Sequence, residues 1–183
     1  MISYASIDYF SFEGIPFILI ALWNIWMFQP FVSTLHELGH GLPALFLTRG
    51  KVKIRVGEGK GIFFRRPYNL GERFSFEISF KNTRVGYTQF EEQKKGSQLI
   101  ILLGGPLVTF FLTLQAGDLL FARNLPSWAE LLLVSWFCGN FLAFLRSVIP
   151  TYLKPTQSFP QGAPSDGMQI ITLLFGALPK RNS

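Results

Sequence analysis

The chain has 183 residues, of which 49% are hydrophobic and 16% aromatic, while only 15% carry a charged side chain. Soluble domains contain about 25% charged residues, so this composition argues against an ordinary soluble protein and indicates a small membrane protein with a single domain, residues 1–183. The net charge of +6 is not accompanied by a recognised nucleic-acid-binding motif, so we expect no nucleic-acid partner.

Residues 15–48 form the first long apolar run of the chain. As one helix they would be about 50 Å long, which exceeds the hydrocarbon core of a bilayer of about 30 Å. A proline lacks a backbone donor and can kink or break a helix, so we expect Pro30 to divide the run and residues 31–48 to form a separate helix. Arg49 and Gly50 are typical of the end of that helix.

The two histidines of the chain, His36 and His40, lie in this run, with Glu37 between them in a His-Glu-x-x-His pattern. Residues four apart share a helix face, so both imidazoles can bind one zinc ion. Glu37, beside them, can act as a base on a water molecule bound to that ion. The alternative is that both are ordinary core histidines. Ionisable residues in an apolar segment are costly unless they are paired, metal-bound or functional, which favours Zn²⁺ as a cofactor.

Residues 51–97 change character, because polar and apolar residues alternate in two stretches, 51–56 and 74–81. A period of two predicts strands, so we expect a small antiparallel sheet at the membrane surface. Twelve of the seventeen Lys and Arg residues fall within residues 49–97, which predicts that this β-rich insertion is cytoplasmic. It is either a connecting hairpin or a strand edge that pairs with an extended substrate segment.

Residues 98–121 and 129–150 are two further apolar runs that are long enough to span a bilayer. The first contains Gly104, Gly105 and Pro106, which allow close helix packing and a bend. The sequence therefore predicts a mainly α-helical multi-pass membrane protein with three or four transmembrane helices.

Residues 151–165 are rich in Pro and Gly and predict a loop, and residues 167–178 would form a helix of only about 18 Å, too short to cross a bilayer alone. Asp166 lies between them. If residues 49–97 are cytoplasmic, Asp166 is on the same side of the membrane as the end of the histidine helix. Catalytic zinc commonly has three protein ligands, so Asp166 is the candidate for the third, although it could instead merely cap the short helix.

Three motifs in this order resemble the site-2 protease family of intramembrane zinc metalloproteases: His36-Glu37-x-x-His40, Gly104-Gly105-Pro106 and Asp166-Gly167. The resemblance extends over most of residues 31–171 in order and spacing. It implies zinc bound by the two histidines and the aspartate, the glutamate as the base, and a membrane protein substrate that is cleaved within or beside its transmembrane segment.

The chain departs in two places from the family's Asn-x-x-Pro-x-x-Pro-x-Asp-Gly motif. Ser147 stands where the family has Asn, in Ser147-Val148-Ile149-Pro150, and fifteen residues separate Pro150 from Asp166 where the family has a much shorter link. The resemblance implies that Ser147, together with Gly104, Gly105 and Pro106, positions the substrate.

We therefore expect a compact, divergent intramembrane zinc metalloendopeptidase of the cell membrane, in contact with the lipid bilayer. A catalytically inactive membrane regulator or scaffold that keeps the metal site is the alternative. A metal transporter is disfavoured, because it would normally carry more ionisable residues in its spans. The sequence indicates neither the substrate nor the oligomeric state.

Overall fold

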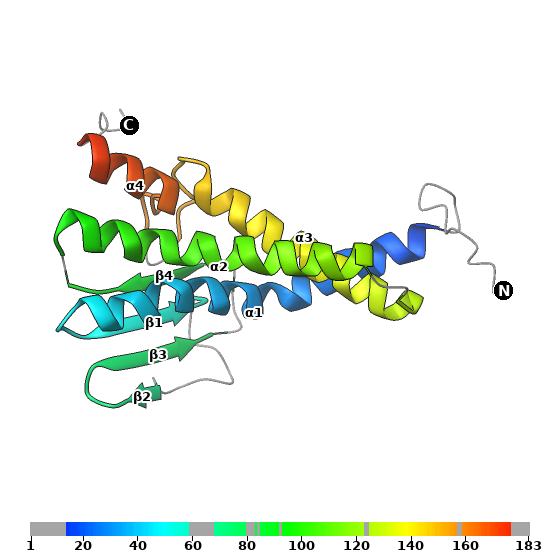
Figure 1. The fold of residues 1–183 in the computed structure, drawn as a ribbon, viewed down its shortest axis with the longest axis horizontal. Helices are drawn as coiled ribbons and strands as arrows, with labels where there is room; N and C mark the ends of the chain where they lie inside the picture. The colour runs from blue at the N-terminus through cyan, green and yellow to red at the C-terminus, as the bar shows by residue number, and fades with distance from the viewer. Residues whose placement is uncertain are drawn as a thin grey trace.

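The computed structural model describes residues 14–58, 68–79, 83, 85–91, 93–122, 125–156 and 159–176. In this part of the chain, three long helices pack against one another, namely α1 (Ile15–Leu47), α2 (Lys95–Ala122) and α3 (Ser127–Val148) (Figure 1). All three are long and apolar enough to cross a membrane, and a fourth, short helix, α4 (Asp166–Phe175), follows. The prediction of a mainly α-helical membrane protein is confirmed.

Helix α1 contradicts the expectation that Pro30 divides the first apolar run. The helix continues through Pro30 and Pro43 over 33 residues. A proline inside a helix removes one backbone hydrogen bond, and membrane helices tolerate this loss where neighbouring helices and side chains satisfy the freed groups. Helix α1 packs against both α2 and α3, and its histidine segment belongs to the same continuous helix as its N-terminal half.

A four-stranded sheet lies between α1 and α2 in the chain, with strands β1 (Val52–Val56), β2 (Tyr68–Leu70), β3 (Phe74–Ile78) and β4 (Gly86–Gln89) in the spatial order β2-β3-β1-β4. Strand β1 pairs parallel with β3 and antiparallel with β4, while β2 and β3 pair antiparallel. The predicted sheet is present, but it is mixed: two of its strand pairs are antiparallel as predicted, and the β1–β3 pair is parallel. Parallel neighbours need a long connection, which residues 57–73 supply.

The sheet packs beside the C-terminal half of α1, at the end of the molecule where α4 also lies (Figure 1). Val52, Ile54 and Val56 of β1 are fully buried. Gly41 of α1 lets the sheet approach, because an added Cβ at this position would overlap the side chain of Ile54. The alternation of buried and half-buried residues in β1 is the period-two pattern of the sequence.

Residues 151–156 and 159–165 form the arms of a short hairpin that folds back over the sheet, and we call this segment the 151–165 hairpin. Its two arms are joined by a hydrogen bond from the Leu153 amide to the Ala163 carbonyl (2.8 Å). Near its tip, the ring of Phe159 stands edge-on to Tyr87 of β4, with ring centroids 5.4 Å apart. The hairpin returns the chain to the end of α3, where the Ser165 amide donates to the Thr151 carbonyl (2.9 Å). Helix α4 therefore begins close to the end of α3, although the connecting segment is long.

Candidate metal centre

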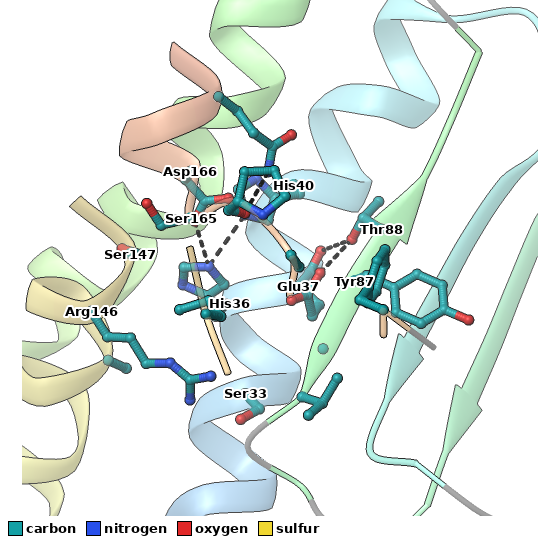
Figure 2. Close-up of a pocket in the computed structure, with 18 of the residues that line it drawn as sticks. Ser33, His36, Glu37, His40, Tyr87, Thr88, Arg146, Ser147, Ser165 and Asp166 are labelled. Carbon is teal, nitrogen blue, oxygen red and sulfur yellow. Dashed lines mark hydrogen bonds and ion pairs between the residues drawn. The ribbon is translucent and has the colours of Figure 1, made fainter. Parts of the chain in front are cut away.

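Three side chains that are far apart in the sequence meet at one point, and we call them the His–His–Asp cluster (His36, His40 and Asp166) (Figure 2). The two histidine Nε2 atoms are 3.2 Å apart. Asp166, the first residue of α4, places Oδ2 3.1 Å from His36 Nε2 and Oδ1 3.4 Å from His40 Nε2. The structure thus brings together the three residues predicted as metal ligands.

The spacing of these atoms fits a zinc ion. Ligand atoms that bind zinc tetrahedrally at bond lengths of about 2.0 to 2.1 Å lie about 3.4 Å from one another. The two Nε2 atoms are 3.2 Å apart, and each lies 3.1 or 3.4 Å from a different oxygen of the Asp166 carboxylate. One ligand atom from each of the three residues lies within 4.8 Å of the other two. Two imidazoles and one carboxylate are also a usual donor set for catalytic zinc, so the cluster fits the ion in size and in chemistry.

The contacts of His40 indicate that its Nε2 presents a lone pair to the centre of the cluster. His40 Nδ1 lies 2.7 Å from the carbonyl oxygen of Ile101, and because a carbonyl can only accept, we assign the imidazole proton to Nδ1. The Gly105 amide also lies near Nδ1, at the longer distance of 3.4 Å. Zinc-binding histidines commonly donate their other ring N–H to a backbone carbonyl in this way, which fixes the orientation of the ring. Nδ1 of His36 is buried and has no partner among the described residues.

Asp166 reaches the histidines because α4 begins directly against the end of α3. The Ser165 hydroxyl caps α4 by accepting from the Met168 amide (3.2 Å) and donates to the Ile149 carbonyl (2.7 Å). A Cβ on Gly167 would overlap the carbonyl oxygen of Val148. The Asp166-Gly167 pair therefore combines a ligand with the one residue type that permits this contact between helices.

The electrostatic balance at Asp166 favours the carboxylate that a metal ligand requires. Burial alone would raise the pKa of the Asp166 carboxyl, because charge is costly away from water. Protonated imidazoles at His36 and His40, which donate to the carboxylate and attract its charge, outweigh burial and hold this pKa well below its usual value. A bound cation would act on the carboxylate in the same direction and would leave both Nε2 lone pairs directed at the ion. The carboxylate is thus the stable form throughout the physiological range.

Glu37 is buried and is held by β4, which sequence analysis did not foresee. The Thr88 hydroxyl donates to Glu37 Oε2 (2.8 Å), and its contact with the Glu37 backbone carbonyl is longer, at 3.2 Å (Figure 2). A Cβ on Gly86 would lie 2.6 Å from Glu37 Oε1, so only glycine lets β4 approach the carboxylate this closely. The alternating pattern predicted a strand near here but not its contact with the motif.

The Gly104-Gly105-Pro106 segment of α2 packs against the histidine face of α1, as the packing argument predicted. A Cβ on Gly104 would overlap the carbonyl oxygen of Gly39. A Cβ on Gly105 would overlap His40 Nε2 and lie 2.8 Å from His36 Nε2. None of the three residues is among those that line the cavity described below, so a substrate-positioning role for them stays a prediction.

Ser147 is buried in the last turns of α3, and its hydroxyl donates to the Phe144 carbonyl (2.8 Å). The residue lines the cavity, but its single proton is committed to its own helix. The amide of an asparagine carries two donor hydrogens and could also reach a substrate. The substrate-positioning role of Ser147 stays a prediction, limited to accepting a hydrogen bond.

A cavity of about 640 Å³ opens beside the His–His–Asp cluster. Its walls come from α1, α3, β4 with its flanking residues, and the 151–165 hairpin. Ligand pockets commonly have volumes of about 300 to 1,000 Å³, so the cavity can hold a short peptide segment. Strand β4 is the end strand of the sheet, and its residues line the cavity.

No protein-family model matches the chain, and no curated protein matches it in sequence. The resemblance in motif order stays a prediction. The chemistry of the site follows from the His–His–Asp cluster, from Glu37 and from the cavity beside them.

Proposed function

We propose that the protein is a zinc-dependent endopeptidase that cleaves a membrane protein substrate within or beside its transmembrane segment. The observation that carries this proposal is the meeting of His36, His40 and Asp166 at zinc-ligand spacing inside a group of membrane-spanning helices. Glu37, the neighbour of His36, supplies the one further acid–base group that hydrolysis needs.

Each described group has a distinct part in the reaction. Zinc held by His36, His40 and Asp166 would supply Lewis-acid activation, which lowers the pKa of a water molecule to about 7. Glu37 takes a proton from this water as general base and returns it to the leaving amine as general acid. Thr88 holds the carboxylate by its hydrogen bond to Oε2.

The substrate has to arrive in extended form, because the hydrogen bonds of a helix shield its peptide bonds. Strand β4 has β1 on one side only, since it ends the sheet, and its residues line the cavity. A strand edge in this position can hold an unwound segment by backbone hydrogen bonds, so that a carbonyl group reaches the metal site.

Removal of the third ligand tests the metal site. Purified wild-type protein should bind about one zinc ion per chain and cleave a fluorescent transmembrane peptide in vesicles. Asp166→Ala should weaken zinc binding by about a hundredfold or more and abolish cleavage, because only two protein ligands remain. Atomic absorption and a cleavage assay measure the two effects.

Asp118→Ala is the matched control. It removes an exposed carboxylate of α2, away from the His–His–Asp cluster, and should behave as the wild type. Equal zinc content in Asp166→Ala and wild type would exclude Asp166 as a ligand. Zinc binding without cleavage of any substrate by the wild type would favour the inactive regulator or scaffold instead.

We further propose that the protein lies in the cell membrane with its sheet in the cytoplasm, because twelve of its seventeen Lys and Arg residues fall within residues 49–97. A Cys138→Ala background removes the single native cysteine. In intact cells, a membrane-impermeant maleimide should then label Ser127→Cys at the opposite end of α2 and α3, but not Glu72→Cys in the exposed turn before β3. The reverse labelling pattern would invert the topology.

A further inference from the structure

The cavity carries basic side chains that the proposed chemistry does not use. Arg146 and Lys154 line it, and so do two carboxylates, those of Glu37 and Asp166. Each carboxylate is already held by other groups, Asp166 by both imidazoles and Glu37 by Thr88. The negative charges of Glu37 and Asp166 equal the positive charges of Arg146 and Lys154. A bound zinc ion would therefore give the described lining of the cavity a net charge of about +2.

Of the two basic residues that line the cavity, Arg146 belongs to a candidate membrane-spanning helix. It lies in the last turn of α3, within a candidate span, and it is an exposed residue that lines the cavity. An arginine near the end of a span commonly extends to the membrane surface, so an arginine that instead lines an internal cavity points to a function there. Figure 2 shows the side chain reaching from α3 into the space between His36 and Ser33.

The floor of the cavity on this side is polar as well. Ser33 and Gln29 lie on the same face of α1 as His36, about one and two turns before it, and the Gln29 amide donates to the Ser33 hydroxyl (3.3 Å). From Ser33 to His36 the helix rises about 4.5 Å, and an extended peptide advances about 3.3 Å per residue. A substrate group beside Arg146 and Ser33 therefore belongs to a residue about one to three positions from the cleaved bond.

We propose that Arg146 forms a carboxylate-binding subsite that selects substrates with an acidic side chain one to three residues from the scissile bond. The guanidinium group binds carboxylates in a bidentate manner, and it does so more strongly in a site shielded from water. The proposal rests on the proposed function for its reference to a scissile bond, but the subsite itself can be measured as binding.

The test uses zinc-loaded full-length protein carrying Glu37→Gln, which binds substrate without cleaving it, in phosphatidylcholine vesicles. The probes are Leu- and Ala-rich transmembrane peptides, labelled for fluorescence transfer, with a single Glu, Gln or Lys at successive positions along the membrane-spanning part. Neither end of these peptides reaches the cavity, so a terminal carboxylate does not contribute.

At one position, the Glu peptide should bind about tenfold or more tightly than the Lys peptide. Adding Arg146→Glu should invert this preference, Arg146→Gln should remove it, and Arg146→Lys should keep part of it. Lys154→Glu makes the same change in net charge elsewhere on the cavity wall and should keep the preference for Glu.

Equal binding of the Glu and Lys peptides at every position would overturn the proposal, as would an Arg146→Glu protein that keeps the original preference. A Lys154→Glu protein whose preference for the Glu peptide is inverted to the same extent would also overturn it. That result would show a general electrostatic attraction of the cavity for acidic peptides and no subsite at Arg146. A wild-type protein that binds with the predicted preference but cleaves no peptide would reject the protease function and retain the subsite.

Discussion

Replacing Glu37 by Gln should leave zinc bound and lower the rate of peptide cleavage by about a thousandfold. Gln keeps the size of Glu and an oxygen that the Thr88 hydroxyl can reach, but its amide cannot take a proton from water. The His–His–Asp cluster loses no ligand. The measurement is kcat for one transmembrane peptide in vesicles, together with zinc content by atomic absorption.

The companion variant Thr88→Val removes the 2.8 Å hydrogen bond to Glu37 and leaves the carboxylate in place. A hydrogen bond to a charged group contributes about 1.5 to 3 kcal/mol, so the loss of orientation should lower kcat by about ten- to a hundredfold, less than the loss of the base itself. A Glu37→Gln protein that keeps a rate near that of the wild type would show that another group acts as the base.

Gly105→Ala should abolish zinc binding while the helices remain folded. The added methyl group would overlap His40 Nε2 and lie 2.8 Å from His36 Nε2, which is the space that a bound ion needs. We expect zinc affinity to fall by about a hundredfold or more, with cleavage lost in proportion. Zinc content, cleavage and circular dichroism before and after heating provide the measurements.

Two other glycines of α2 give matched controls for this change. Gly96 has open space around its Cβ position, so Gly96→Ala should bind zinc as the wild type does. Gly104→Ala should instead lower the unfolding temperature, because its methyl group would overlap the Gly39 carbonyl and push α1 away from α2. Normal zinc affinity in Gly105→Ala would mean that no ion lies between the two Nε2 atoms.

The helices and the members of the candidate site could be predicted because their signals are local or chemically exclusive. Apolar runs of sufficient length predict spans, and two histidines four residues apart share a face in any helix. Asp166 could be named because few acidic residues lie at the correct end of a span. The sequence did not show that α4 begins in contact with the end of α3, which is what places Asp166 beside the histidines.

The errors and omissions concern relations between elements. A period of two identifies a strand but contains no information about the direction in which it pairs, so the parallel β1–β3 pair was missed. Pro30 removes one hydrogen bond in any setting, and only the packing of α1 against α2 and α3 decides whether the helix continues. Thr88 and Gly86 have no motif of their own, because their importance comes from the approach of β4 to Glu37.

The length of α1 determines how deep the His–His–Asp cluster lies in the membrane. A helix of 33 residues is about 50 Å long, and tilting alone would have to reach about 50° to fit it within the hydrocarbon core. Transmembrane helices tilt by about 0 to 40°, so part of α1 extends beyond the acyl chains. The sheet packs on its C-terminal half, which identifies that half as the emerging part. Hydrophobic mismatch thus sets how deeply His36 and His40 sit below the lipid headgroups, and a thicker bilayer would lengthen the path that water must travel to reach them.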